Sequence, residues 1–343
     1  MTRDTKAVHN ESIVIDGSFT HFDLPITPTR DIPDMMLDHI LAGGVTAVVH
    51  SVIADPSPMT AEEALMELHK NSLIFDAFPD KTIQVRRVSD IEAAKAQNKL
   101  GIVFSTQGLA SIGTNMRYIW VFHCLGVKIM QLTYNEQSAL GSGCREPVDS
   151  GLTRFGQQAI ENMNDLGIVL DLSHCGVKTS LDAMKHSRDP VIFSHAAVRR
   201  LNSHVRNLTD DQIKAVGEKG GVIGLCPHCI FVEKARGTRP TIADYLEHVD
   251  YVANLIGIDH VGIGTDNFHY DNYYTRLARA SFERTYPGFF GGYTAEEKHA
   301  LGFSKWSDWP ILTEALLSRG YSESDTKKVL GGNFLRVFRQ IWR

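Results

Sequence analysis

The chain has 343 residues, with 35 Lys and Arg against 40 Asp and Glu, so its formal charge is −5, and 43% of its residues are hydrophobic. No Lys/Arg cluster has the density of a nucleic-acid surface, and no apolar run reaches the ~18 residues of a membrane span, so neither nucleic acid nor a membrane is an expected partner. The composition is typical of a globular protein, and α/β barrels of this length commonly form one domain. We therefore expect a single domain over residues 1–343.

Compartment is suggested by the amino terminus and the cysteines. Residues 1–11 are polar and mixed in charge, without the apolar centre of a secretory signal. The five cysteines are an odd number and are scattered, which favours reduced thiols over a disulfide framework. Only the stretch 226–229, Cys-Pro-His-Cys, is spaced like half of a zinc or redox site, and without a second pair it is more typical of a strand end and its loop. A cytoplasmic protein is expected.

Short apolar segments alternate with amphipathic ones along the whole chain. The apolar segments predict strands, and the amphipathic segments predict helices, with capping-box spacing at Thr60 and Glu63 and at Ser89 and Glu92. Eight strands are expected at residues 12–16, 45–50, 101–106, 128–133, 168–172, 191–195, 222–226 and 260–266. Helices are expected at residues 34–42, 60–78, 89–98, 115–125, 153–166, 177–186, 209–218, 241–255, 311–317 and 323–342.

This alternation predicts an α/β fold of the (β/α)₈ TIM-type barrel class. The competing architecture is a doubly wound open sheet. The barrel is favoured because chemically useful residues follow the third, fourth, fifth, sixth and eighth strands, and only a closed barrel brings all of those ends to one rim. The loops 135–151 and 268–304 are expected near that rim, and the last two helices are expected to pack on the outside of the barrel.

Two neighbouring predicted strands end in the same dipeptide, Ser-His. The first is followed by Ser173 and His174, and the second by Ser194 and His195, with a predicted helix between them. A single histidine at a strand end is usually structural. Two imidazoles at the ends of adjacent parallel strands would lie close together, however, and imidazole pairs suit a metal such as zinc. The sequence therefore predicts a metal site at His174 and His195.

With these residues in place, the chain resembles the membrane (renal) dipeptidase family of zinc metallopeptidases in the amidohydrolase superfamily. The resemblance covers most of the chain. The motifs that carry it are Val-Leu-Asp-Leu-Ser-His at 169–174, Pro-Val-Ile-Phe-Ser-His at 190–195, Arg-Asn at 206–207 with Asp-Asp at 210–211, Val-Gly-Ile-Gly-Thr-Asp at 261–266 and Gly-Gly-Asn-Phe-Leu-Arg-Val-Phe at 331–338.

The resemblance implies a metal-dependent hydrolase, of the metallo-dependent hydrolase barrel type, that cleaves an amide bond in a dipeptide or a similar small carboxylate-bearing substrate with a metal-activated water. In this family the two strand-end histidines bind zinc, which assigns that role to His174 and His195. Arg206 matches the arginine that holds the substrate carboxylate. Asp266 matches the acid that takes a proton from water and passes it to the leaving amine. Resemblance and the apolar outer helices are also compatible with a homodimer.

Three departures from the family pattern concern the metals and the substrate. The family's His-x-Asp after the first strand is replaced by Ser18 and Thr20, although residues 21–25, His-Phe-Asp-Leu-Pro, reproduce the motif three residues later. His21 and Asp23 are thus either displaced ligands or ordinary loop residues. The glutamate that bridges two metals is Gln107 here, and a neutral amide is a poor zinc ligand. One zinc is therefore favoured over two.

The third departure is Tyr134, which stands where the family has a histidine that contacts the substrate. Tyr134 either donates a hydrogen bond to a substrate carbonyl or packs at the rim. Two alternatives to the hydrolase follow from the altered residues. The first is a one-metal or metal-free barrel with deacylase or lyase chemistry. The second is a non-catalytic protein that binds a small molecule at Arg206 and Asp266.

Overall fold

The computed structural model describes residues 5–20, 34–54, 59–268, 280, 283, 284, 286–288 and 290–342. Eight parallel strands follow one another around a sheet in their order along the chain. They are β1 (Ile15–Phe19), β2 (Ala47–Ala54), β4 (Leu100–Gln107), β5 (Val127–Gln131), β6 (Val169–Asp171), β7 (Val191–Ala196), β8 (Val222–Leu225) and β9 (Val261–Ile263). A short additional strand, β3 (Thr82–Gln84), pairs with β4 at the side.

The sheet nearly closes on itself, which confirms the predicted (β/α)₈ barrel. No strand pairing joins β9 to β1 among the described residues. The gap is instead bridged by a side chain, because the Asp16 carboxylate of β1 accepts hydrogen bonds from the Thr265 N–H (2.8 Å) and hydroxyl (2.6 Å) just beyond β9. An open doubly wound sheet would not bring these two strands together.

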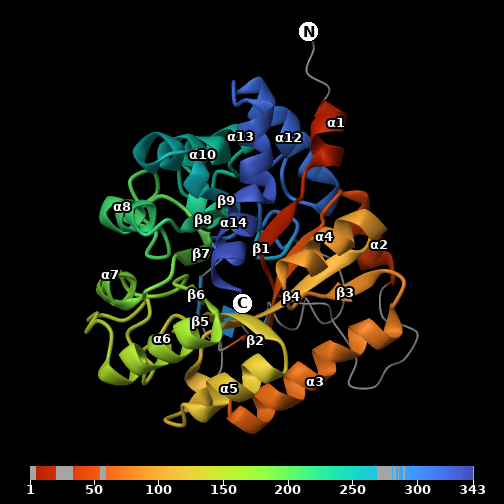
Figure 1. Ribbon diagram of the computed structural model, residues 1–343. Helices are drawn as coiled ribbons and strands as arrows, with labels where there is room; N and C mark the ends of the chain where they lie inside the picture. Colours follow the sequence, from red (N-terminus) through yellow and green to blue (C-terminus); the bar gives the residue numbers. More distant parts are fainter. Residues whose placement is uncertain are drawn as a thin grey trace.

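Helices surround the sheet (Figure 1). The longer ones in the ring are α2 (Asp34–Ala42), α3 (Ala61–Ala77), α4 (Val88–Gln97), α5 (Arg117–Cys124), α6 (Arg154–Leu166), α7 (Val177–His186), α8 (Asp210–Glu218), α10 (Ile242–Ile256) and α12 (Trp309–Ser318). Shorter pieces are α1 (Thr5–Glu11), α9 (Cys229–Val232), α13 (Glu323–Lys327), the 3₁₀ turns η1 (Ala110–Ile112), η2 (Ile258–His260) and η3 (Trp306–Asp308), and the π turn η4 (Lys328–Gly332). No helix in the described part of the chain is long and apolar enough to span a bilayer.

Most predicted elements are found with small shifts at their ends, but the first strand is displaced. The predicted range is 12–16, whereas β1 runs from Ile15 to Phe19 and includes Gly17. Gly17 is a packing requirement of this strand and not a signal for its end. A Cβ at this position would lie 2.7 Å from the Phe334 ring and 2.8 Å from the Ser194 carbonyl, so only glycine fits. The displacement places Ser18 inside the strand. The helix α1 and the strand β3 have no counterpart among the predicted elements.

The caps of two helices can be compared with their predicted positions. The capping box of Thr60 and Glu63 is present at the start of α3. The box predicted from Ser89 and Glu92 is wrong, because α4 begins one residue earlier and the Asp90 carboxylate accepts the backbone N–H groups of residues 86 (2.9 Å) and 87 (3.0 Å). A carboxylate in the first turn satisfies the same free N–H groups.

The last helix, α14 (Asn333–Ile341), differs from the expectation that the C-terminal helices would lie on the outside. It covers the end of the barrel where strands begin, and Figure 1 shows it within the ring of strands. Asn333 donates hydrogen bonds to the carbonyls of Ile258 (2.8 Å) and Val261 (2.7 Å), at the start of β9. Phe334 is fully buried and packs with inward-facing strand residues such as Ile15 and Val222. The opposite end is left for the functional residues.

Truncation of Phe334 to Ala is expected to destabilise the fold by about 3–5 kcal/mol, because a large buried ring is removed from the base of the barrel. Urea unfolding followed by circular dichroism measures this change. Met66→Ala serves as the control, since Met66 is 60% exposed and its truncation should change the free energy of unfolding by under about 0.5 kcal/mol. Equal changes in the free energy of unfolding for the two substitutions would contradict the role of α14 in covering the end of the barrel where the strands begin.

Candidate metal and substrate site

The residues singled out in the sequence lie at the carboxyl ends of their strands. Gln107 is the last residue of β4, and Tyr134 follows β5 by three residues. His174 follows β6 by three residues, and His195 is the fifth residue of β7. Asp266 follows β9 by three residues. His21 and Asp23 lie outside the described residues.

The two histidines converge as the Ser-His repeat predicted. The Nε2 atoms of His174 and His195 are 2.9 Å apart, and their ring centroids are separated by 4.9 Å. Both side chains are buried. Adjacent strands of a parallel sheet therefore deliver two imidazole nitrogens to one point on the rim.

The outer nitrogens of both rings are held by defined partners. His174 Nδ1 lies 2.8 Å from the Asn135 amide oxygen, which also accepts from the Cys144 thiol (3.6 Å). Since an amide oxygen only accepts, His174 carries its proton on Nδ1. His195 Nδ1 lies 2.8 Å from the Ser194 hydroxyl, whose own proton is donated to Asp171 (2.5 Å). His195 is thus also protonated on Nδ1.

With both protons on Nδ1, the two facing Nε2 atoms present lone pairs to each other at 2.9 Å. Burial lowers the pKa of His195 to about 3 and the pKa of His174 well below its usual value, so protonation is a poor way to relieve this contact. Neutral imidazoles oriented by hydrogen bonds at the outer nitrogen are the ligand form that metals require. The residues present therefore fit a metal ion at this pair.

The pair supplies two ligands. The described part of the chain holds no cluster of three or more His, Cys, Asp or Glu side chains suited to a metal.

The neighbouring strands offer neutral groups where a second metal would need acids. Gln107 is buried, and its amide nitrogen donates a hydrogen bond to the Ser18 hydroxyl of β1 (3.3 Å). An amide and a hydroxyl bring no negative charge to this position. The pair resembles a small polar contact between β1 and β4 more than a ligand set for a dication.

Asp266 has an unusual backbone conformation, with φ of 54°. Burial would raise the pKa of its carboxyl, but the positive charges of Lys298 and Arg206 outweigh burial, so the pKa is lowered overall. Lys298 places its Nζ 3.8 Å from Asp266 Oδ2 and also donates to the Asp266 backbone carbonyl. Asp266 is therefore an ionised carboxylate beside the histidine pair.

Arg206 is a buried cation without a carboxylate partner among the described residues. Its Nη2 donates to the His195 carbonyl (3.1 Å), its guanidinium lies 5.6 Å from the Phe231 ring centroid, and its Nε has no hydrogen-bond partner in that part of the chain. Burying an uncompensated charge is costly. An anionic substrate group would supply the missing partner.

Tyr134 stacks on His174, with ring centroids 4.2 Å apart and an angle of 21° between the planes. Burial, together with the charge of Asp266, raises the pKa of the Tyr134 hydroxyl well above its usual value. The phenol therefore stays protonated and can donate a hydrogen bond. Packing and donation are compatible at this position, since the ring face contacts the imidazole and the hydroxyl projects from its edge.

Several residues that orient the site were not predicted. Asp171 and Ser194 lie within the two Ser-His motifs, but they were predicted only as strand residues. The signal that could have identified them is a polar residue inside an otherwise apolar strand. Asn135 directly follows Tyr134 in an otherwise irregular loop. Lys298 comes from a distant loop and had no signal in the sequence, because its role depends only on where the chain returns to the rim.

Loss of the Ser194 hydroxyl is expected to weaken metal binding by about 10–100-fold, the usual effect of removing a partner that orients a ligand. Ser194→Ala leaves His195 Nδ1 without its acceptor, and zinc affinity can be measured by competition with a chromophoric chelator. Ser180→Ala is the matched control, because Ser180 is a buried serine of α7 that donates to Val177. Unchanged zinc affinity in Ser194→Ala would contradict the orienting role.

The family model described as membrane dipeptidase (peptidase family M19) matches residues 2–273 and 285–343. Dipeptidase tcpJ of Claviceps purpurea is 26% identical over 350 residues, which is 97% of this chain and 76% of that protein. Dipeptidase 3 of Mus musculus is 28% identical over 270 residues, 75% of this chain. The match with the mouse protein spans about half (48%) of that protein's length. A separate match with dipeptidase aclJ of Aspergillus oryzae spans 57% of the length of that protein.

Solved structures agree with these matches. An amidohydrolase from Pseudomonas aeruginosa superimposes with a TM-score of 0.85 at 33% identity, covering 98% of this chain and 99% of that one. A metallo peptidase from Rhodobacter sphaeroides, liganded with a phosphinate mimic of the dipeptide L-Ala-D-Ala, has a TM-score of 0.80 at 21% identity and covers 97% and 100% of the two chains. The second likeness concerns the fold alone. Together, the relatives support a metal-dependent, dipeptidase-like hydrolase and give no support to a lyase or a non-catalytic binding protein.

Proposed function

Because the chain belongs to the membrane dipeptidase family, peptidase family M19, we propose that it hydrolyses the amide bond of a dipeptide or a similar small amide that bears a carboxylate. The observation that carries the proposal is the convergence of His174 and His195, whose facing nitrogens are 2.9 Å apart. A metal-free barrel would have no use for two imidazole lone pairs directed at one point.

The metal is proposed to be zinc, with one ion per chain held by His174 and His195. Neutral imidazole nitrogens are good zinc ligands, whereas the Ser18 and Gln107 pair offers no charge for a second ion. When bound, zinc supplies Lewis acidity, which polarises a carbonyl and makes water easier to deprotonate. If His21 and Asp23 were ligands as well, the count would be two.

Three residues of the chain would then bind the substrate and transfer the proton. Asp266, ionised and beside the histidines, takes a proton from the attacking water and returns it to the leaving amine. Arg206 anchors the substrate carboxylate through its guanidinium, whose Nε has no hydrogen-bond partner among the described residues. Tyr134 donates its hydroxyl proton in a hydrogen bond to the carbonyl oxygen as negative charge develops there.

A cytoplasmic location and a small-molecule substrate are part of the same proposal. All five cysteines are free thiols, which supports a reducing compartment. The homodimer stays a prediction from the resemblance.

The test combines metal analysis with hydrolysis of a dipeptide panel. The purified protein is expected to contain about one zinc per chain, to lose activity on chelation and to regain it when zinc is restored. The panel should include dipeptides with L- and D-residues at the second position. Absence of hydrolysis in the zinc-loaded protein across the panel would overturn the function, and two zinc ions per chain would overturn the one-metal site.

A further inference from the structure

The same hydrogen-bond pattern occurs at two places around the barrel. At the first, the Asp171 carboxylate of β6 accepts the backbone N–H of Ser173, two residues further along, at 2.9 Å. It also accepts the N–H (3.0 Å) and the hydroxyl (2.5 Å) of Ser194 on the neighbouring strand β7. His195 directly follows Ser194. Asp171 therefore fixes the residue that precedes a proposed metal ligand.

The second copy of the pattern joins β1 to the segment after β9. The Asp16 carboxylate accepts the N–H of Ser18, again two residues further along, at 3.1 Å. It also accepts the N–H (2.8 Å) and the hydroxyl (2.6 Å) of Thr265. Asp266 directly follows Thr265. Asp16 therefore fixes the residue that precedes the proposed general base.

Thr265 is held at every one of its polar atoms. Its N–H and hydroxyl bind Asp16, and its carbonyl accepts a hydrogen bond from His299 Nε2 at 2.7 Å. Burial lowers the pKa of His299 well below its usual value, so the ring is neutral and its proton lies on Nε2. Because Thr265 and His299 are both buried, water is not available to replace these partners.

Asp266 and the residue after it adopt a backbone conformation that is uncommon for residues with a Cβ. The φ angles of Asp266 and Asn267 are 54° and 65°, in the left-handed region. Strand β1 contacts the chain on this side of Asp266 as well, because the Ser18 carbonyl accepts the Asn267 N–H (3.4 Å). Lys298 donates to the backbone carbonyls of both residues. The direction of the Asp266 carboxylate is thus set by contacts that its neighbours make.

The Asp16 carboxylate depends on its donors in return. It is fully buried and forms no ion pair with a described residue. Burial raises its pKa to about 7, whereas the hydrogen bonds from Thr265 and Ser18 favour the ionised form. A buried carboxylate oxygen that loses its donor is costly. Asp16 and Thr265 therefore stabilise each other, and loss of either partner disturbs the other.

We propose that Asp16 and Thr265 are positioning residues of the reaction, which hold Asp266 in its left-handed conformation beside the histidine pair. The inference rests on the proposed hydrolysis and deepens it, because it assigns to these two residues a role that they perform only through Asp266. The repeated pattern supports the proposal, since the same arrangement at Asp171 holds the residue before His195.

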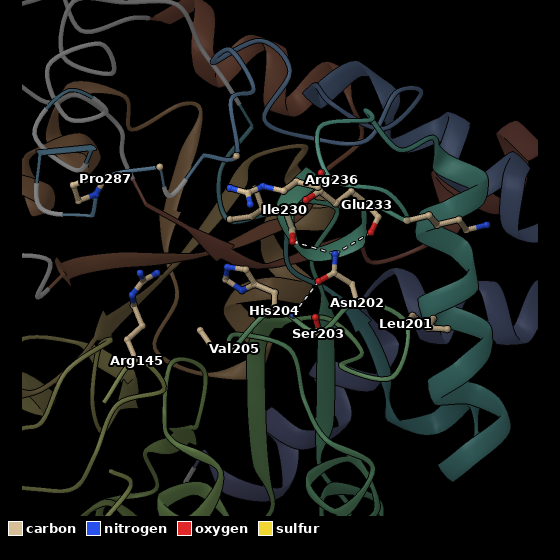
Figure 2. A pocket seen from close by; sticks show the side chains of 13 residues that line it. Arg145, Leu201, Asn202, Ser203, His204, Val205, Ile230, Glu233, Arg236 and Pro287 are labelled. Atoms are coloured by element: carbon tan, nitrogen blue, oxygen red, sulfur yellow. Dashed lines mark hydrogen bonds between the residues drawn. The ribbon is translucent and has the colours of Figure 1, made fainter. Parts of the chain in front are cut away.

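The largest open space among the loops does not involve this contact. A cavity of about 690 Å³ lies among the loops after β7 and β8, and Figure 2 shows the residues that line it. Asn202 holds its wall, donating to the carbonyls of Ile230 (3.3 Å) and Glu233 (2.9 Å). Thr265 and Asp266, which are both described residues, lie outside this lining. An altered cavity is therefore not expected to contribute to the effect of a change at Thr265.

Thr265→Val removes the hydroxyl and nearly keeps the shape of the side chain. For the dipeptide that the unsubstituted protein cleaves fastest, kcat should fall by about tenfold or more, because catalysis is sensitive to small displacements of a reacting group. KM and zinc content should change by less than about twofold. Thr265→Ser, which keeps the hydroxyl, should retain kcat within about threefold. A Thr265→Val protein whose kcat stays within about twofold of the unsubstituted value would overturn the proposal.

Thr326→Val is the matched control. Thr326 is a buried threonine of α13 whose hydroxyl has no hydrogen-bond partner in the described part of the chain, so its kcat should be unchanged. Circular dichroism shows whether each variant is folded. If Thr265→Val does not fold, the milder variants Thr265→Ser and Asp16→Asn carry the test, and equal kcat in Asp16→Asn and the unsubstituted protein would overturn the proposal.

Two double-mutant cycles test whether the pair acts through Asp266. In the Asp266→Asn background, Thr265→Val should lower the residual kcat by no more than about twofold, whereas a merely structural role would lower it equally in both backgrounds. Asp16→Asn cannot accept both donors of Thr265, so it should lower kcat by itself and add no more than about twofold to Thr265→Val. Additive effects in either cycle would overturn the proposal.

Hydrogen exchange separates this inference from the proposed function. Amide exchange followed by mass spectrometry reports how firmly residues 265–267 are held, without catalysis. Faster exchange in Thr265→Val than in Thr326→Val would support the hold on Asp266 even if the zinc-loaded protein hydrolysed no dipeptide, a result that removes the proposed function alone. Unchanged exchange together with full kcat in Thr265→Val would keep the function and overturn the positioning role.

Discussion

Asp266→Asn is expected to lower kcat by about 10²–10⁴-fold, the usual contribution of a general acid–base residue. The amide has nearly the same shape but cannot take a proton from water. Asn also adopts positive φ readily, so the backbone at φ 54° should be preserved. Zinc content and the circular dichroism spectrum should match those of the unsubstituted protein, which separates loss of chemistry from loss of structure.

The control for Asp266→Asn is Asp259→Asn, which changes an acid that pairs with Lys328 (2.8 Å) just before β9, at the end of the barrel opposite the rim. This variant should retain kcat within about twofold. If Asp266→Asn kept kcat within threefold while the zinc content was unchanged, another group would have to move the proton.

His195→Leu is expected to abolish zinc binding at micromolar zinc and to reduce hydrolysis to the background rate. The substitution leaves only one of the two converging imidazoles. The loss of zinc affinity should therefore exceed about 100-fold, the upper range for residues that only orient a ligand. Ser194 and Asp171 keep their mutual hydrogen bond, so the strand end should not collapse. Bound zinc is measured by atomic absorption after dialysis. The rate of hydrolysis is measured with the dipeptide that the unsubstituted protein cleaves fastest.

A histidine outside the site provides the comparison for His195→Leu. His186 lies at the end of α7 and contacts Glu161 (3.2 Å), so His186→Leu should retain both zinc and activity. A His195→Leu protein that still bound one zinc with unchanged affinity would place the metal elsewhere, and the water-activating role of the pair would have to be given up.

The barrel could be predicted because local patterns repeat. Each strand is a short apolar run and each helix has one apolar face, so their alternation is visible without long-range information. The position of α14 could not be predicted from the same pattern. An amphipathic helix has the same sequence whether its apolar face covers the side or the end of a barrel, and the end position depends on glycines such as Gly17 that admit Phe334.

The candidate site was predictable to the extent that its residues follow strands. His174 and His195 repeat one motif on adjacent strands, and the parallel sheet brings them together. Their metal-binding role and those of Asp266 and Arg206 stay predictions. The ring tautomers depend on Asn135 and on the Ser194–Asp171 pair, whose geometry arises only when β5, β6 and β7 align.

The alternation of strands and helices and the two imidazoles at neighbouring strand ends could be predicted, because both follow from local order along the chain. Contacts between distant segments exist only in the folded chain, where Gln107 bonds to Ser18 and Lys298 lies beside Asp266. These contacts join segments from about 30 to 90 residues apart. Electrostatic balance in the site depends on such distances in space, and no local pattern in the chain records them.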